Sequence, residues 1–314
     1  MSVRNTFGSF TRPWLRLESA IEESPGEPET IPRRPYGHTG ERLSIIGLGG
    51  MTVRGLPPAE VERIVDETLA RGVNYIDVAP TYGNAEEVLG PAIRDHRDEI
   101  FLACKTTHRK RKEATSELQR SLKRLRTDRL DLYQFHGINS IKEVDTIFGP
   151  GGAMEAFKEA RSQGLISHIG FSAHSVKAAL DCMERYDFDS ILFPVNFVLF
   201  EKESFGPQVV KMAVDRRMAC LALKALAERP WQAGDNKEAF PNCWYRPASD
   251  PRIAELALRF TLSQPVTAAI PPGEEALLRM ALDIASRFAP IASDQLAELR
   301  EIARTRRSIF TLDR

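Results

Sequence analysis

The sequence predicts an α/β protein built as a single (β/α)8 TIM barrel, and three observations lead to this prediction. Short apolar runs recur along the chain, and most are separated by segments with helical periodicity. Each run is apolar on both faces, which is typical of parallel strands covered by helices. Eight such units in about 250 residues match the usual size of this barrel. A doubly wound open sheet is the alternative fold.

The expected strands and helices alternate in order along the chain. The eight strands are expected at residues 43–48, 73–78, 99–104, 130–135, 167–171, 190–195, 219–223 and 266–270. The helix over residues 58–72 illustrates the intervening segments, because Val61 and Ile64 share an apolar face and Gly72 ends the pattern. A second helix is predicted at 115–128, and one further amphipathic helix at 293–306.

Three segments lie outside this repeat. Residues 1–34 are rich in Glu, Pro and Ser and are interpreted as an N-terminal arm, which leaves 35–314 for the barrel. A turn at His38-Thr39-Gly40 between two short runs predicts a hairpin ahead of the barrel. Residues 224–249 form an insertion after the seventh strand. A loop of this length is usually functional, and an insertion packed on the surface is the alternative.

Composition excludes several classes of function. The 314 residues carry 43 basic and 43 acidic side chains, so net charge does not favour nucleic acid or a membrane surface as a partner. The four cysteines are scattered without a Cys-x-x-Cys pair, which predicts no zinc or iron–sulfur site. No apolar stretch is long enough to span a membrane, and the N-terminus lacks a signal peptide, so a cytoplasmic location is expected.

Four ionisable side chains follow three consecutive predicted strands. Asp77 lies near the end of the second strand, and Tyr82 lies in the loop beyond it. Lys105 directly follows the third strand, and His136 directly follows the fourth. Each residue alone has a structural explanation, such as an ion pair. Because barrel active sites form at the carboxyl ends of strands, all four together predict a catalytic site at that end.

The four residue types suit the reduction of a carbonyl group. A phenol has an ordinary pKa of about 10, and an ammonium nearby lowers it, so Lys105 held by Asp77 is expected to lower the pKa of Tyr82. Tyr82 could then act as a general acid, while neutral His136 orients the carbonyl. No side chain can deliver hydride, so a nicotinamide cofactor is implied.

These residues resemble the Asp-Tyr-Lys-His tetrad of the aldo-keto reductase superfamily. The supporting stretches run from about residue 34 to the end and include "GVNYIDVAPTYGNAEEVLG", "FLACKT" and "RLRTDRLDLYQFHG". The resemblance implies NAD(P)H-dependent reduction of an aldehyde or ketone, with a small-molecule carbonyl compound as the partner. The stretches "HIGFSAHS", "PVNFV" and "CWYRP" resemble a branch whose members often carry a C-terminal iron–sulfur module, which is not expected here because the cysteines are not clustered.

The same resemblance implies a set of cofactor contacts. They are Gly49, Ser172, Asn196, Leu223, Lys224, Pro272, Gly273 and Arg279. The chain departs from the family where Ala173 follows Ser172 and where Leu223 stands in place of a stacking tyrosine. Glu274 and Glu275 begin the helix that would hold the adenosine phosphate, where like charge would oppose it. Arg279 falls where the family has its phosphate-binding arginine, so NADPH is expected, and the two glutamates leave NADH as the alternative.

The substrate contacts are predicted at Met51, His108, Trp231 and Trp244. The basic run "HRKRK" at 108–112 is interpreted as a solvated segment or a contact to an anionic substrate. Two other functions stay open at this point. One is a regulatory protein that senses nicotinamide nucleotides without catalysis, and the other is a barrel isomerase or dehydratase. The oligomeric state is not predicted.

Overall fold

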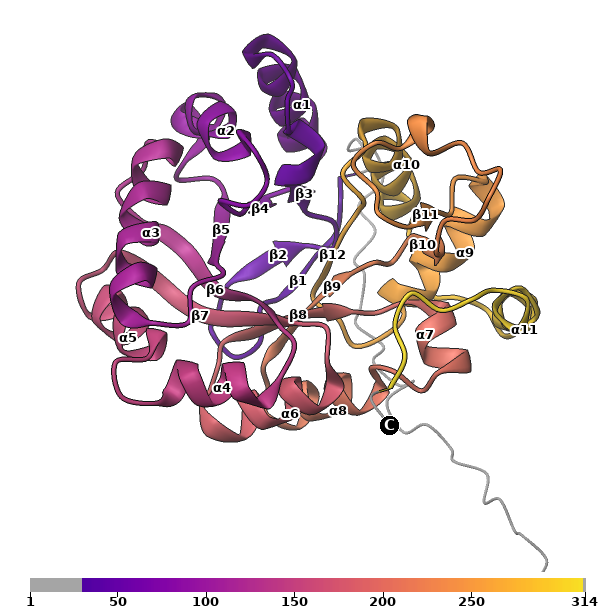
Figure 1. The fold of residues 1–314 in the computed structure, drawn as a ribbon. Helices are drawn as coiled ribbons and strands as arrows, with labels where there is room; N and C mark the ends of the chain where they lie inside the picture. Colours follow the sequence, from indigo (N-terminus) through magenta and orange to yellow (C-terminus); the bar gives the residue numbers. More distant parts are fainter. Residues whose placement is uncertain (1–29, 313–314) are drawn as a thin grey trace, which may run out of the picture.

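The computed structural model describes residues 30–312, and these residues form the predicted barrel (Figure 1). Eight strands pair in parallel, in the spatial order β12-β9-β8-β7-β6-β5-β4-β3. A parallel bridge between Ile46 and Ala269 links the two ends of this sheet. The strands are β3 (Leu48–Gly49), β4 (Tyr75–Asp77), β5 (Phe101–Thr106), β6 (Leu130–Ile138), β7 (Ile166–Ala173), β8 (Ser190–Pro194), β9 (Ala219–Leu223) and β12 (Ala268–Ile270).

Helices surround the strands, as Figure 1 shows. They are α1 (Pro58–Ala70), α2 (Ala85–Ile93), α3 (Arg111–Leu125), α4 (Ile141–Phe148), α5 (Ala153–Ser162), α6 (Val176–Arg185), α7 (Phe197–Lys202), α8 (Pro207–Asp215), α9 (Pro251–Leu262), α10 (Glu275–Ser286) and α11 (Ser293–Arg304). In α1, Val61, Ile64 and Val65 are buried as the sequence pattern predicts. The helix expected at 293–306 is confirmed as α11.

The first predicted strand, at residues 43–48, is wrong as a single element. Its first residues belong to a separate antiparallel hairpin, in which β2 (Arg42–Ser44) pairs with β1 (Arg33–Pro35). The turn of this hairpin lies where the sequence predicted it. The barrel strand begins only at Leu48, because the chain bends between the two strands while the apolar run continues through the bend. The arm predicted at 1–34 lies outside the described residues up to residue 29, and β1 already belongs to the folded part.

The hairpin fills the amino end of the barrel. Tyr36 and Leu43 are buried in an inner cluster with Tyr75, Phe101 and Leu132, which project from the strands into the barrel. The Tyr36 and Phe101 rings lie 4.9 Å apart between centroids. Because large side chains occupy this end, the polar groups of the interior are left at the opposite, carboxyl end.

The insertion after β9 has secondary structure of its own. It contains a short antiparallel hairpin of β10 (Ala227–Arg229) and β11 (Arg246–Pro247), joined by a loop with the 3₁₀ turn η4 (Lys237–Ala239). Glu228 accepts hydrogen bonds and ion pairs from Arg246 and Arg306, so the insertion is joined to the segment that follows α11. Within residues 30–312, no helix is long and apolar enough to cross a membrane.

Candidate active site

The centre of the site is an ion pair between Lys105 and Asp77. The ammonium donates to Asp77 Oδ1 and also to the Val78 carbonyl oxygen, 3.2 Å away. Lys105 is 0% exposed and Asp77 is 2% exposed. Burial alone would lower the pKa of Lys105, but Asp77 and Tyr82 outweigh it and the pKa of Lys105 is raised. The ammonium is therefore kept charged inside the barrel.

Two further donors hold the Asp77 carboxylate, and sequence reasoning missed both. The Tyr75 hydroxyl donates to Oδ2 at 3.2 Å, and Gln134 Nε2 donates to the same oxygen at 3.0 Å. Strand periodicity could have found them, because side chains two positions apart on a strand face the same side. Tyr75 precedes Asp77 by two positions, and Gln134 precedes His136 by two.

Tyr82 lies over the Lys105 ammonium. The Lys105 Nζ atom is 5.2 Å from the centroid of the Tyr82 ring. Burial raises the pKa of Tyr82, Lys105 opposes this, and Asp77 adds to it, so the pKa of Tyr82 is raised overall. The sequence predicted a lowered pKa, which is wrong in direction. Lys105 acts as expected, but desolvation of the phenolate outweighs it.

His136 completes the group of four and is neutral. Its ring packs edge-on against Tyr82, with 5.7 Å between the centroids. Burial first, and then the charge of Lys105, lower the pKa of His136 to about 3. Among the described residues, its Nδ1 atom is buried without a hydrogen-bond partner. A neutral imidazole carries one donor and one acceptor nitrogen, so His136 has the chemistry to bond a carbonyl oxygen.

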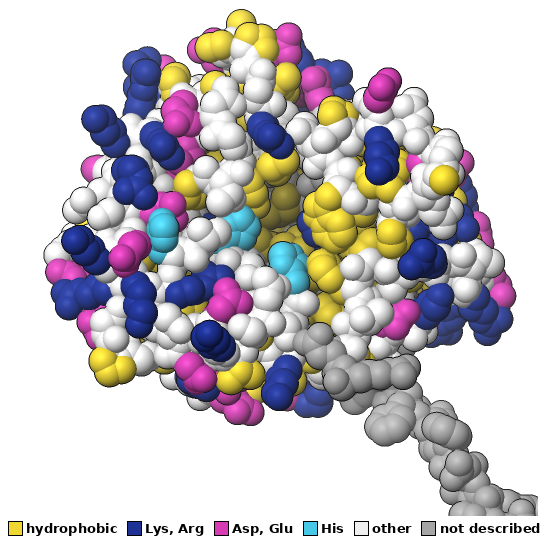
Figure 2. Space-filling model, viewed as in Figure 1, with side chains coloured by type: hydrophobic (Ala, Val, Ile, Leu, Met, Phe, Trp, Pro, Cys, Tyr) yellow, Lys and Arg dark blue, Asp and Glu magenta, His cyan; other side chains and the backbone are white. Residues whose placement is uncertain are grey.

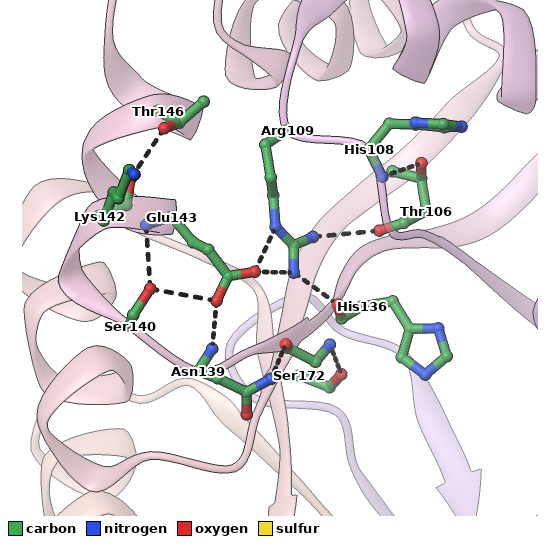
Figure 3. Close-up of polar contacts among 11 residues, drawn as sticks. Thr106, His108, Arg109, His136, Asn139, Ser140, Lys142, Glu143, Thr146 and Ser172 are labelled. Carbon is green, nitrogen blue, oxygen red and sulfur yellow. Dashed lines mark hydrogen bonds and ion pairs between the residues drawn. The ribbon is translucent and has the colours of Figure 1, made fainter.

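Backbone contacts position His136 (Figure 3). Arg109 donates to the His136 carbonyl oxygen at 2.7 Å while it pairs with Glu143 at 2.9 Å. The Ser172 hydroxyl accepts from the Gly137 backbone N–H at 2.7 Å. Ser172, which the sequence predicted as a cofactor contact, thus supports the last residues of β6 beside His136. The basic run that includes Arg109 is neutralised in part by carboxylates, since Arg111 also pairs with Glu155 and Glu159.

The four residues lie at the carboxyl end of the barrel, as the order of the strands required. Figure 2 shows a hollow at the centre of the face that Figure 1 looks onto, bordered by hydrophobic and histidine side chains. The inner ends of two strands contribute Leu223 and Ile270, which are partly buried and pack on the inner cluster. The same end of the barrel thus carries these two apolar side chains and the four polar residues of the candidate site.

Comparison with known proteins decides the family. The model of the aldo/keto reductase family matches residues 45–241, which contain all four residues of the tetrad.

The chain belongs to the aldo/keto reductase family.

Curated relatives from Bacillus subtilis agree with this placement. The aldo-keto reductase YhdN is 32% identical over 207 residues, which are 60% of this chain and 60% of that protein. The uncharacterized oxidoreductase YqkF is 30% identical over 184 residues, which are 54% of this chain and 57% of that protein. The chain thus matches less than two thirds of the length of these relatives. Among solved structures, the holo form of the aldo-keto reductase AKR11C1 from Bacillus halodurans superposes with a TM-score of 0.68 at 23% identity, over 87% of this chain and 96% of that one.

Several predicted cofactor positions of this aldo/keto reductase family member pack closely around β3. Gly49 pairs in register with Asp77, and a Cβ atom there would lie 2.8 Å from the Ile270 side chain, so glycine is required. Gly273 packs against Met51, because its Cβ position is 2.5 Å from Met51 Cβ. Pro272 and Gly273 are both buried just before α10. The segment before α10 therefore contacts the loop after β3.

Two predicted cofactor residues are bonded to other groups of the protein in this structure. The Asn196 amide donates to the carbonyl oxygens of Lys224 and Ala227, and its Oδ1 accepts from the first N–H groups of α7. It thus holds the start of the insertion and has no group left for a carboxamide. Arg279 is on the outer surface, where it pairs with Glu67 at 2.8 Å and with Glu275 at 2.9 Å.

The predicted substrate residues differ in their placement. Trp244 is 54% exposed, and its ring lies 5.3 Å from the Lys224 Nζ atom. Trp231 instead donates to the Cys243 carbonyl oxygen at 2.9 Å and stabilises the insertion internally. His108 faces Glu117, with 3.5 Å between Nε2 and Oε1. Sequence reasoning missed His174, whose ring stacks on Phe310 from the segment after α11, 5.1 Å between centroids.

Proposed function

We propose that the protein reduces an aldehyde or a ketone with a hydride from a reduced nicotinamide cofactor. The observation that carries this proposal is the contact of Tyr82 with the buried Lys105–Asp77 pair, beside neutral His136. Such a group of a phenol, an ammonium and an imidazole can bind a carbonyl oxygen and protonate it.

Each residue has a distinct role in the proposed reaction. Tyr82 donates its proton to the carbonyl oxygen as negative charge develops there. Its raised pKa keeps the phenol protonated until that moment. The Lys105 ammonium then stabilises the phenolate that is left, and Asp77 keeps the ammonium in place. Neutral His136 hydrogen-bonds the carbonyl oxygen and orients it, without competing as an acid, because its pKa is about 3.

The residues around the hollow fit a nicotinamide. Among residues 30–312, Gln134 Oε1 is buried without a partner and could accept from a carboxamide. Leu223 and Ile270 offer an apolar surface for the flat ring, and Gly49 lets the Ile270 side chain pack closely against β3. When bound, the reduced nicotinamide supplies the hydride to the carbonyl carbon. The chain itself binds and orients both reactants and supplies the proton.

The cofactor preference is part of this proposal. Arg279, the residue expected to favour a 2′-phosphate, is paired with two carboxylates. Glu274 accepts from the Asn242 N–H at 2.7 Å, so its carboxylate faces the insertion near the start of α10. We therefore propose that NADH competes with NADPH more strongly than the sequence alone suggested.

Turnover by the Tyr82→Phe variant tests the function. Oxidation of NADPH and of NADH is followed against a panel of aldehydes, with Tyr186→Phe as the matched control because Tyr186 bonds Arg161 on the surface. We expect Tyr82→Phe to lower kcat about 100-fold or more, the usual scale for a lost general acid, and to change the Kd of the nucleotide little. Wild-type protein that binds the nucleotide but reduces no aldehyde or ketone would favour the regulatory alternative. Unchanged turnover in Tyr82→Phe would contradict the assigned mechanism.

A further inference from the structure

A second lysine, Lys224, lies at the carboxyl end of the barrel, and the proposed mechanism does not use it. Lys224 directly follows β9 and has a left-handed backbone, with φ of 69°. A non-glycine residue in this region is uncommon and needs support from its surroundings. The support comes from Asn196, which donates to the Lys224 carbonyl oxygen at 3.0 Å. The fold thus fixes this lysine in a conformation that it would rarely adopt alone.

Two aromatic rings hold the ammonium of Lys224. Its Nζ atom lies 5.3 Å from the centroid of Trp244 and 5.1 Å from that of Tyr245. Such cation–π contacts stabilise a cation but leave its charge unneutralised. Both rings belong to the insertion, and Trp244 also packs against Phe310, 5.7 Å between centroids. The insertion and the segment after α11 therefore build the wall in which this lysine stands.

In the part of the chain that the structure describes, the charge of Lys224 has no counter-ion. Within residues 30–312, neither a carboxylate nor a hydrogen-bond acceptor is paired with Nζ. Burial lowers the pKa of Lys224 to about 8, so the side chain is mostly protonated at pH 7. An unpaired, partly buried cation is costly unless something neutralises it. In contrast, the Lys105 ammonium is paired with Asp77, and Arg109 is paired with Glu143.

Contacts between side chains connect Lys224 to the four polar residues of the site. Phe310, which packs on Trp244, also stacks on His174 with 5.1 Å between centroids. A Cβ atom on Gly137, the neighbour of His136, would lie 3.9 Å from His174 Nδ1.

Burial first, and then the charge of Lys224, lower the pKa of His174 to about 4. The same charge adds to the lowering of the pKa of His136, after burial and Lys105. His136 is the residue that would orient the carbonyl. An anionic group attached close to that carbonyl could therefore reach the Lys224 ammonium. The two charges would attract, because the unneutralised charge of Lys224 is positive.

We infer that Lys224 binds an anionic group of the substrate, so that the preferred substrates are carbonyl compounds bearing a carboxylate or a phosphate near the reacting carbon. This inference rests on the proposed function, because it names the substrate class of that site. The diphosphate of the cofactor is the other anion that could meet this lysine, and the two sources give different results.

Matched aldehydes measure the contribution of the charge. The ratio of kcat/KM for 4-carboxybenzaldehyde to that for its methyl ester is determined at pH 7, for wild type and for Lys224→Met, Lys224→Arg and Lys237→Met. This ratio does not depend on the folded fraction of a variant. We expect Lys224→Met to lower it about 10- to 100-fold, the range for a lost hydrogen bond to a charged group. Lys224→Arg should retain most of the ratio. Lys237→Met, an exposed lysine of the same insertion, is the control.

Binding measurements separate the possible failures. The Kd of benzoate and of benzamide is measured by calorimetry, and that of NADPH and NADH by quenching of tryptophan fluorescence. Benzoate binding that weakens in Lys224→Met, with benzamide much less affected, supports the inference even if no aldehyde is reduced, in which case the proposed function alone fails. An unchanged acid-to-ester ratio overturns the inference while the proposed function stands. A loss of nucleotide affinity larger than the change in that ratio also overturns it, since Lys224 would then serve the cofactor.

Discussion

Replacing Lys105 with methionine tests whether the central pair is a stabilising element as well as a catalytic one. The substitution keeps the length of the side chain and removes its charge. Asp77 would then be left 2% exposed without its cation. Two neutral donors, the Tyr75 hydroxyl and the Gln134 amide, would remain on its Oδ2 atom.

The expected loss follows from this partial compensation. Removing one partner of a buried ion pair typically costs about 3–5 kcal/mol, because the other charge is left uncompensated. A hydrogen bond to a charged group contributes about 1.5–3 kcal/mol, and Asp77 keeps two of them. We therefore expect the free energy of unfolding of Lys105→Met to fall by about 3 kcal/mol, the lower end of the range for such pairs.

Urea unfolding at pH 7, followed by tryptophan fluorescence, measures this loss. The double variant Lys105→Met/Asp77→Asn should regain at least half of it, because no buried charge remains. Carbonyl reduction should stay low in both variants, since Tyr82 lacks the ammonium. Lys211→Met is the matched control, because its pair with Asp215 is exposed, and such a pair contributes about 0.3–0.5 kcal/mol. A loss below about 1 kcal/mol in Lys105→Met, or a double variant no more stable than the single one, would refute the reasoning.

Two further predictions concern titration and the cofactor. The neutral ring of His136, with a pKa of about 3, predicts that kcat/KM for an uncharged aldehyde shows no break near pH 6.5. The pKa of His174 is about 4 in the folded protein and about 6.5 when unfolded, so stability is lost as the pH falls below about 6.5. His174→Gln should therefore gain about 2 kcal/mol relative to wild type in urea unfolding between pH 7 and pH 5, and no gain would contradict the assigned pKa. Glu67→Gln removes one of the carboxylates that pair with Arg279. It should tighten the binding of NADPH relative to that of NADH by about two- to fivefold, measured as Kd by fluorescence quenching. A preference for NADPH that stays the same or falls would exclude Arg279 from the phosphate site.

The repeat of apolar runs predicts the barrel because each parallel strand must be apolar on both faces. The error at residues 43–48 has a physical cause. Hydrophobicity reports burial, and both β2 of the hairpin and β3 of the barrel are buried. The bend between them carries no polar residue that would interrupt the run, since Ile45 and Ile46 are also buried. A pattern of burial alone cannot place such a bend.

The tetrad could be predicted because strand ends meet at one end of a barrel, whatever the loops do. The partners that Asn196 and Arg279 have in the structure could not be predicted from the sequence. Asn196 is used by the backbone of the insertion, and Arg279 by Glu67 of α1, more than 200 positions away in the sequence. Their partners depend on how distant segments pack. The direction of the pKa of Tyr82 was missed for a related reason, because it depends on how fully the fold desolvates the ring.

The raised pKa of Tyr82 bears on the direction of the proposed reaction. Asp77 has two opposing effects, since it holds the ammonium that favours phenolate while its own charge raises the pKa of the phenol. Burial adds to the second effect, so the free site holds Tyr82 as an acid. Reduction of a carbonyl needs that acid, whereas oxidation of an alcohol would begin from the phenolate. The same carboxylate therefore keeps the proton on Tyr82 before the reaction and, through Lys105, makes its loss less costly when an alkoxide forms. This balance keeps the proton that carbonyl reduction needs on Tyr82 at neutral pH.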